Sequence, residues 1–425
     1  MGVSRTAAGD LLLGGMLLSD VVSQASVDTP FYAYDLDAMD REARDLVASF
    51  GEVPHLVAYA VKANTAGPVL RRFATAGLGA DVVSGSELSV AMRAGVLPEK
   101  IVFSGVAKRD DEIALAFGAG ERGILAIQLE SLEEIPRAAA VARRMGRKGR
   151  VALRINPSVD KESLATHSHI STGHDEAKFG ISLDDVTDAL AAVKSHNALE
   201  LVGVNMHIGS QLTDTSAYVD AARKLYRIAK DIRDNGCTSL AYVDTGGGFG
   251  IDYGEGCAVT PADFVRGVRK AQAEFGLSDL MWVVEPGRAL VAAHGVIVSR
   301  VIAPKRSGRC QWLLIDAGMN DLIRPALYQA RHRIVPLALK LNDTSVDFRV
   351  VGPVCESSDD FGIHAMPERP PTHVAILDAG AYGFTMASQY NGRALPAEVF
   401  IEGGKVTHFL PGISASEWVE RRLLG

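Results

Sequence analysis

At 425 residues the chain is longer than one hydrophobic core usually supports, so we expect two domains. Its 44 basic and 51 acidic residues give a formal net charge of -7 and form no basic stripe, which argues against nucleic acid as a partner. The four cysteines form no Cys-x-x-Cys pair, which argues against a zinc ribbon, a redox dithiol or a secreted disulfide framework and predicts a cytoplasmic protein.

The first element is a short apolar run from Leu11 to Leu18. It has the composition of a signal-peptide core, and the Met-Gly-Val-Ser-Arg-Thr before it formally matches a myristoylation pattern. Both matches are weak, because Asp10 and Asp20 flank a run that glycines interrupt and that is too short to span a bilayer. We expect a surface strand or turn here, and no membrane-spanning segment.

From Phe31 to about Leu290, short β-rich runs alternate with helical patterns. The β-rich runs are 55–61, 79–83, 101–104, 124–129, 151–155, 201–207, 241–245 and 281–285. The helical patterns include 68–77, 86–95, 131–145, 183–196 and 216–235. Such alternation predicts parallel strands joined by helical crossovers. Eight units in about 260 residues predict a (β/α)8 barrel, with a doubly wound open sheet as the alternative.

Reactive side chains follow the carboxyl ends of these runs, which is where (β/α)8 barrels build their active sites. They are Lys62, Asp81, Ser84, Arg154, His207, Ser210, Gly246 to Gly248, Glu285 and Arg288. A purely structural origin would scatter such residues over both ends of the barrel. We therefore expect a functional site at the carboxyl ends of the strands.

The 158–180 segment is long for a connection in such a barrel and predicts a functional loop. It contains His167, His169 and His174. These histidines have no recognised metal-ligand spacing and no carboxylate in register, so we expect no metal site and a solvated or substrate-gating loop. After Arg288, β-branched and apolar runs predict a separate, mainly β domain. Those runs are 295–302, 311–316, 346–354, 373–378 and 398–410.

Lys62 ends an apolar run, which is a costly place for an ammonium group. Desolvation there favours the neutral amine, which condenses with an aldehyde in Schiff-base lysines. A lysine that extends its charged head into solvent from the strand end is the alternative.

Gly246 to Gly248 follow a strand, and three residues without side chains let backbone amides approach a phosphate. Their spacing matches neither a nucleotide P-loop nor a dinucleotide site, so one phosphate monoester fits better, with a plain turn as the alternative. Glu285 suits a role in keeping a pyridine nitrogen protonated, with an ion pair to Arg288 as the alternative. His207 suits stacking on such a ring, with a core histidine as the alternative.

The second domain offers two further pairs. Arg324 and Tyr328 place a guanidinium and a phenol near each other, which suits a carboxylate. Cys355 and Glu356 place a thiol and a carboxylate just past a strand, with a buried structural cysteine as the alternative for Cys355.

Several motifs together match one family in their order and spacing. They are Ala60 to Asn64, Arg154 to Pro157, His169 to Gly173 with Lys178 to Gly180, His207 to Gln211, Gly246 to Gly250, Glu285 to Arg288, Met319 to Tyr328, Gly352 to Glu356, and Gly380 to Gly383. From about Thr29 to Pro396 the chain resembles the alanine-racemase-fold pyridoxal-phosphate decarboxylases, which are related to ornithine decarboxylase. The resemblance implies a (β/α)8 barrel domain at 30–287, and a β-sandwich or β-barrel-like domain from 1–29 plus 288–425.

The resemblance also implies pyridoxal 5'-phosphate as the cofactor, with Lys62 bonded to it, Glu285 on the ring nitrogen and His207 on the ring face. Further cofactor contacts would come from Asp81, Arg154, Ser210, Gly246, Gly247, Gly248, Gly287, Arg288 and Tyr382. The substrate would contact Arg288, Arg324, Tyr328, Glu356 and Tyr382. Cys355 would donate a proton, and it would join Lys62, Glu285 and His207 as a catalytic residue. In this family Cys355 and Glu356 come from the partner subunit of a homodimer.

The implied activity is decarboxylation of meso-diaminopimelate to L-lysine, the last step of lysine biosynthesis. The alternatives are a decarboxylase of the same fold acting on ornithine, D-lysine, arginine or carboxynorspermidine, an alanine racemase, and a non-catalytic regulatory protein that binds the cofactor. A substrate without a distal carboxylate would leave Arg324 facing an uncompensated cation. The chain departs from the family pattern at Ser357 to Asp360, where Ser358 replaces a glycine. We therefore expect a reshaped loop that affects substrate preference more than reaction type.

Overall fold

The computed structural model describes residues 2–24, 27–159, 172–174, 177–257, 259–340 and 343–424. The chain divides into two compact units. The barrel unit comprises Glu42–Ile251 and Cys257–Ala289, and the β unit comprises Met1–Arg41, Asp252–Gly256 and Leu290–Gly425.

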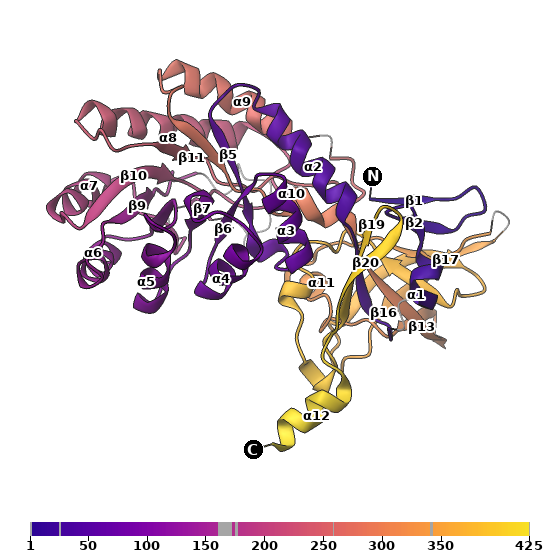
Figure 1. Cartoon of the computed structure of the whole chain (residues 1–425). Helices are drawn as coiled ribbons and strands as arrows, with labels where there is room; N and C mark the ends of the chain where they lie inside the picture. Colours follow the sequence, from indigo (N-terminus) through magenta and orange to yellow (C-terminus); the bar gives the residue numbers. More distant parts are fainter. Residues whose placement is uncertain are drawn as a thin grey trace. The chain divides into compact units, whose positions relative to one another are not determined.

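Eight parallel strands close into a barrel in the barrel unit (Figure 1). In chain order they are β5 (His55–Ala60), β6 (Gly79–Val82), β7 (Ile101–Phe103), β8 (Ala126–Leu129), β9 (Gly149–Arg154), β10 (Leu199–Asn205), β11 (Tyr242–Asp244) and β12 (Met281–Val284). The last strand pairs with the first, with Trp282 opposite His55, and this pairing closes the sheet. The predicted (β/α)8 barrel is confirmed, and closure rules out the doubly wound open sheet.

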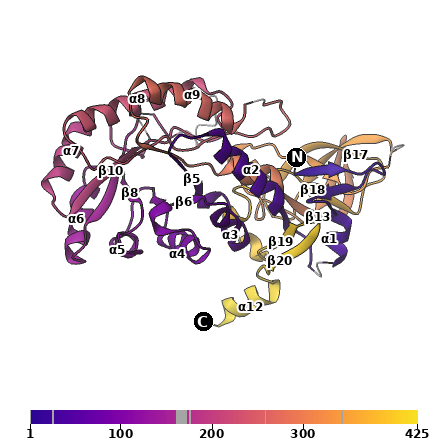
Figure 2. The same cartoon turned by 45° about the horizontal axis from the view of Figure 1, so that its top comes forward.

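Helices follow one another around the outside of these strands (Figure 2). They are α3 (Gly67–Thr75), α4 (Gly85–Arg93), α5 (Asp110–Gly118), α6 (Glu134–Arg144), α7 (Val186–Ser195), α8 (Ser216–Asp234) and α9 (Pro261–Glu274), with short 3-10 helices η1 (Val61–Ala63) and η2 (Pro98–Lys100). Each longer helix buries an apolar stripe, as α8 does with Ala222, Leu225 and Tyr226. This stripe holds the helices against the strands.

The interior of the barrel is apolar at the amino ends of the strands and polar at their carboxyl ends. Leu56, Leu125 and Tyr242 belong to an apolar cluster at the amino ends of the strands. Gly203 has no side chain there, because a Cβ atom would lie 2.4 Å from the ring of Tyr242. The apolar filling leaves the carboxyl ends of the strands for polar groups.

The β unit contains a nine-stranded sheet. Its strands are β4 (Phe31–Asp35), β13 (Gly295–Ser307), β14 (Cys310–Ile315), β15 (Ile334–Pro336), β16 (Ser345–Val351), β17 (Asp360–Pro367), β18 (His373–Ile376), β19 (Ala397–Glu402) and β20 (Lys405–Leu410). The long strand β13 pairs with β4 and β18 near its start and with β14 farther along. The predicted mainly β character of this part is confirmed.

Two details of the β unit differ from the sequence predictions. The single run predicted at 398–410 is a hairpin of β19 and β20, because Gly403 and Gly404 adopt positive φ angles and turn the chain. Strand β4 pairs with β13 and β19, so it lies in the β unit, although residue 30 is the predicted start of the barrel domain.

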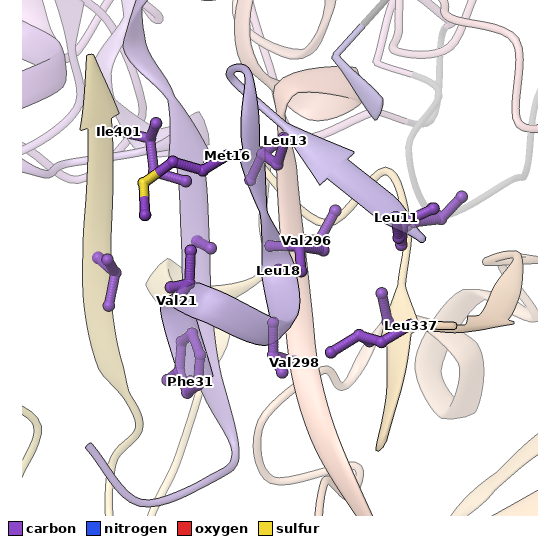
Figure 3. Close-up of a cluster of buried hydrophobic side chains, with 14 of the residues drawn as sticks. Leu11, Leu13, Met16, Leu18, Val21, Phe31, Val296, Val298, Leu337 and Ile401 are labelled. Atoms are coloured by element: carbon purple, nitrogen blue, oxygen red, sulfur yellow. The ribbon is translucent and has the colours of Figure 1, made fainter. Parts of the chain in front are cut away.

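The apolar run near the N-terminus is part of the β-unit core, not of its surface as predicted (Figure 3). It forms strands β2 (Leu11–Leu13) and β3 (Met16–Leu17) of a three-stranded sheet with β1 (Val3–Arg5), followed by helix α1 (Leu18–Gln24). Leu13 and Leu18 are fully buried and pack in one cluster with Phe31 and Val296. The run is apolar because it fills this core.

The remaining helices are short except for α2 (Leu36–Ser49). They are α10 (Arg288–Val291), α11 (Arg324–Tyr328) and α12 (Ala415–Leu423), with 3-10 helices η5 (Ala292–His294), η6 (Phe384–Met386) and η7 (Tyr390–Gly392). In the part of the chain that the structure describes, no helix is both long and apolar enough to cross a membrane.

Candidate active site

Lys62 lies in η1, directly after strand β5. Its Nζ atom donates to Oδ2 of Asp81 at 2.7 Å. The Lys62 side chain is 35% exposed, whereas that of Asp81 is fully buried. A buried carboxylate therefore draws the amine toward the carboxyl end of the barrel, so Lys62 does not simply extend into solvent.

A chain of buried polar groups continues from Asp81 across the barrel. The hydroxyl of Ser104 lies 2.5 Å from Oδ1 of Asp81 and 2.8 Å from Oε1 of Gln128. Nε2 of Gln128 donates to Oδ2 of Asp244 at 2.9 Å and to Oε1 of Glu285 at 3.0 Å. The side chains of Lys62 and Glu285 are thereby joined through one network.

The carboxyl groups of Asp244 and Glu285 lie together in this network. Burial raises the pKa of Asp244 to about 6. Burial first, and then the neighbouring charges of Asp244 and Asp81, raises the pKa of Glu285 well above its ordinary value. Two acids so close and so buried favour a shared proton, so the barrel unit holds an acidic proton at Glu285 near neutral pH.

His207 follows β10 and presents a neutral imidazole. Its Nδ1 atom accepts a hydrogen bond from the backbone N–H of Gly247 at 3.2 Å, which assigns the proton to Nε2. Burial, and then the charges of Lys62 and Arg154, lowers the pKa of His207 well below its ordinary value. The ring is therefore uncharged at neutral pH.

The glycines after β11 form a backbone cradle in which no side chain fits. A Cβ atom would lie 2.3 Å from the carbonyl oxygen of Met206 at Gly246, 1.9 Å from that of Glu285 at Gly247, and 2.2 Å from that of Gly209 at Gly248. Such contacts are too short for any substitution without movement of the backbone. Gly246 and Gly248 also have positive φ angles of 73° and 100°.

Arg288 lies at the next strand end and donates from Nη2 to the hydroxyl of Ser210 at 3.0 Å. Glu285 contacts the side-chain amides of Gln128 and Asn205 at 3.0 and 3.5 Å. The intervening Gly287 is buried. A guanidinium, a hydroxyl and the glycine amides make this a suitable place for a phosphate group.

Arg154, at the end of β9, pairs with Glu130 at 2.6 Å in a buried contact. Glu130 also accepts hydrogen bonds from the backbone N–H groups of Gly105 and Gly180, at 2.8 and 2.9 Å. It thus links Arg154 to the chain that returns from the 158–180 segment. The guanidinium of Arg154 lies 4.8 Å from the centre of the Phe179 ring.

The sequence predictions missed several groups of this site. Ser104, Gln128, Glu130 and Asp244 lie on or directly after strands β7, β8 and β11. The rule that identified Lys62 would have identified Ser104, Glu130 and Asp244, because all of them stand at carboxyl ends of predicted strands. Gln128 lies inside its strand and gave no such signal.

In the β unit, Arg324 and Tyr328 begin and end the same short helix, α11. Arg324 is buried, and its Nη1 atom lies 2.9 Å from the Tyr253 hydroxyl and 2.9 Å from Nε2 of His332. Nδ1 of His332 bonds to the carbonyl of Leu377, which leaves Nε2 as the acceptor for Arg324. The guanidinium is held in a fixed orientation, which suits recognition of a carboxylate.

Cys355 and Glu356 are exposed on the loop after β16, so the alternative of a buried structural cysteine is wrong. Ser358 in this loop is exposed, and its φ angle is not positive. The loop therefore closes without the left-handed conformation that a glycine would permit. Tyr382 is half-buried and has a positive φ of 56°.

No group of three or more histidine, cysteine, aspartate or glutamate side chains suited to a metal ion occurs among the described residues. Of the three histidines in the 158–180 segment, only His174 is described, and His167 and His169 lie outside the described residues.

The geometry fits pyridoxal phosphate. The barrel unit offers a lysine at a strand end, a buried acid joined to it by a network, a neutral imidazole and a side-chain-free cradle beside Ser210 and Arg288. Residues 36–292 match the family model described as "Pyridoxal-dependent decarboxylase, pyridoxal binding domain". The chain belongs to the pyridoxal-dependent decarboxylases and uses pyridoxal phosphate as its cofactor.

Within this family the chain is similar to diaminopimelate decarboxylases. It is 39% identical to the enzyme of Zymomonas mobilis, with 93% of each chain covered, and 34% identical to that of Aquifex aeolicus, with 94% of this chain and 92% of the other covered. The solved structure of the Helicobacter pylori diaminopimelate decarboxylase complexed with L-lysine matches with a TM-score of 0.89 and 35% identity, covering 96% of this chain and 99% of that one.

Proposed function

We propose that the protein removes one carboxyl group from meso-diaminopimelate and releases L-lysine. The observation that carries the reaction type is the buried network that joins the amine of Lys62 to the acid of Glu285. The relatives named above support the choice of substrate. The main alternative is decarboxylation of another basic amino acid, such as ornithine, D-lysine, arginine or carboxynorspermidine.

Bound pyridoxal phosphate supplies a conjugated ring that accepts the electron pair left behind when carbon dioxide departs. The amine of Lys62 would hold the cofactor covalently until a substrate amine takes its place. Asp81, 2.7 Å from Nζ, orients that amine. Glu285, whose pKa is raised by burial, would keep the ring nitrogen protonated, and this would strengthen the ring as an electron acceptor.

The remaining barrel residues position the cofactor. His207 would offer the face of a neutral imidazole to the cofactor ring without adding charge. Ser210, Arg288 and the amides of Gly246 to Gly248 would hold the phosphate, and we propose Tyr382 as a further contact. The buried side chains of Asp81 and Arg154 would add charge beside the cofactor, and we propose the buried Gly287 as a further contact.

The residues of the β unit select the substrate. Arg324 and Tyr328, with Arg288 and Tyr382, take the distal carboxylate, and Glu356 takes the distal ammonium group. Cys355 returns a proton to the carbon that lost carbon dioxide. A substrate without the distal carboxylate would lose the charge-assisted hydrogen bonds that the oriented guanidinium of Arg324 offers.

The direct test is carbon dioxide release by the purified protein with pyridoxal phosphate. It is offered meso-diaminopimelate, ornithine, arginine and both enantiomers of lysine in parallel. We expect turnover of meso-diaminopimelate with L-lysine as the product. Faster turnover of a diamino acid without the distal carboxylate would contradict the assignment of Arg324.

We further propose that the protein is a cytoplasmic homodimer in which Cys355 and Glu356 of each subunit serve the site of the other. Mixing Lys62→Ala and Cys355→Ala subunits tests this, because a mixed dimer then contains one site with both residues intact. We expect activity to reappear on mixing and subunit exchange. Two inactive variants that stay inactive after exchange would show that each subunit completes its own site.

A further inference from the structure

A short turn in the β unit reaches the loop that bears Cys355 and Glu356. The backbone N–H of Cys355 donates to Oδ1 of Asn391 at 2.8 Å. The hydroxyl of Tyr390 donates to Oε1 of Glu356 at 2.5 Å. Each of the two consecutive residues of the turn thus contacts one of the two consecutive residues of the loop. We call residues 390–393 the clasp.

The backbone of the clasp is shaped for these contacts. Asn391 has φ of 56° and ψ of 22°, a left-handed conformation that asparagine adopts more readily than most residues. The next residue, Gly392, packs so closely on Trp418 that a Cβ atom would lie 3.1 Å from the indole. Arg393 adds a bond from Nη2 to the carbonyl of Pro353 at 3.1 Å. The clasp therefore rests on α12 on one side and holds the loop on the other.

The base of the loop is fixed independently of the clasp. The buried carboxylate of Asp359 accepts hydrogen bonds from the backbone N–H groups of Met319 and Val354, both at 2.7 Å. These bonds anchor the loop just before Cys355, and backbone bonds from Glu356 to Val354 at 2.8 Å and from Asp359 to Glu356 at 3.1 Å shape its tip. The clasp adds the contacts that orient Cys355 and Glu356. Loss of a clasp contact is thus expected to turn the tip without unfolding the unit.

Contact with Glu356 also affects the protonation of Tyr390. The hydrogen bond to the Glu356 carboxylate, and the charge of that carboxylate, raise the pKa of Tyr390 above its ordinary value. Tyr390 therefore remains a donor at neutral pH. It fixes the direction of an exposed carboxylate that would otherwise sample several rotamers.

We propose that the clasp positions the two site residues of this loop separately, Tyr390 through Glu356 and Asn391 through Cys355. The inference rests on the proposed function, in which Glu356 binds a distal ammonium group and Cys355 supplies a proton. Tyr390 then determines affinity for substrates that carry a second ammonium group. Asn391 determines how well the thiol is aimed at the reacting carbon.

The two positioning roles separate in steady-state kinetics. We expect Tyr390→Phe to raise KM for meso-diaminopimelate about fivefold with kcat nearly unchanged, because only a bond to a binding group is lost. We expect Asn391→Gly to lower kcat about tenfold, because the backbone conformation survives while the bond to Cys355 does not. Asn391→Asp keeps the acceptor oxygen and is expected to recover most of that loss.

A double-mutant cycle shows whether Tyr390 acts through its partner. In an enzyme that already carries Glu356→Gln, Tyr390→Phe is expected to change KM less than twofold, because the charged group it orients is gone. An equal change in both backgrounds, or a parallel fall in kcat and in unfolding temperature for both clasp variants, would overturn the positioning roles.

Failure of the clasp is distinguishable from failure of the proposed function. Glu356→Gln and Cys355→Ala in the otherwise unchanged protein report on the function assigned to the loop. If these two variants are impaired while Tyr390→Phe and Asn391→Gly behave like the unchanged protein, the clasp inference is wrong and the proposed function stands. If Glu356→Gln and Cys355→Ala keep normal kinetics, the roles assigned to the loop are wrong, and the clasp inference is overturned with them.

Discussion

The candidate site residues of the barrel unit are buried or half-buried and form a network, whereas Cys355 and Glu356 of the β unit are exposed on a loop. Lys62, Asp81 and Glu285 belong to one network at the ends of barrel strands. The loop instead depends on contacts from residues 390–393, which lie about 35 residues farther along the chain. We therefore expect substitutions in the buried network to have larger effects than substitutions that alter the contacts of the exposed loop.

The largest effect is expected at Lys62. Lys62→Ala removes the amine that holds the cofactor, and we expect carbon dioxide release to fall by at least about a thousandfold. Lys100→Ala is the matched control, because that half-buried lysine directly precedes β7, at the amino end of the strand, and its Nζ atom donates to the carbonyl of Gly77 at 2.8 Å. Far-UV circular dichroism checks the fold. A Lys62→Ala protein that keeps its activity would contradict the catalytic role proposed for Lys62 and for the network that contains it.

Glu285→Gln is expected to lower kcat about a hundredfold, because an amide cannot protonate the ring nitrogen. The buried acid also predicts a pH effect. Since burial raises the pKa of Glu285, the unchanged enzyme is expected to keep its acidic proton at neutral pH and lose activity on the alkaline side. A Glu285→Gln enzyme with unchanged kcat and pH profile would contradict this role.

The glycine cradle gives a third, intermediate effect. Gly247→Ala places a methyl group where only 1.9 Å separates it from the carbonyl oxygen of Glu285, so we expect cofactor affinity to fall at least about tenfold. Gly118→Ala is the control, because there the nearest atom, Cε of Met145, lies 3.4 Å away. Titration with pyridoxal phosphate measures both variants, and equal affinities would argue against the cradle.

The smallest effect concerns stability of the β unit. Burial raises the pKa of Glu398 from an ordinary 4.5 to about 7, with Tyr34 donating to it at 3.0 Å. The folded state therefore prefers the protonated acid, and stability is full below about pH 4.5 and is lost as pH rises toward 7. We expect Glu398→Gln to abolish this loss, which amounts to about 1 to 3 kcal/mol. Denaturant unfolding at several pH values, with Glu368→Gln as the control, measures it.

The barrel was predictable because its pattern is local and repetitive. Each strand is a short buried run, and a residue such as Lys62 or Glu285 stands directly after one of them. Gln128 was missed because it lies inside a strand, where a polar residue has no positional signal. The core position of Leu13 and Leu18 was missed because sequence shows an apolar run but not the sheet that covers it.

The β unit was less predictable because its key contacts join distant segments. The bond between Tyr390 and Glu356 spans 34 residues, and the bond between Arg324 and Tyr253 spans 71. Hydrophobic periodicity in the sequence does not show which distant residues contact one another. The strands themselves were recognisable, but the hairpin at Gly403 and Gly404 and the pairing of β4 depended on turns and partners that a single run does not reveal.

The division of labour between the two units is tested most directly by one ratio, kcat/KM for meso-diaminopimelate divided by that for D-lysine, which lacks only the distal carboxylate. We predict that Glu285→Gln lowers both constants and leaves the ratio unchanged, whereas Arg324→Gln, with Tyr328→Phe as a milder second variant, lowers the ratio by at least about tenfold. A ratio that falls with Glu285→Gln and persists with both β-unit variants would contradict the account.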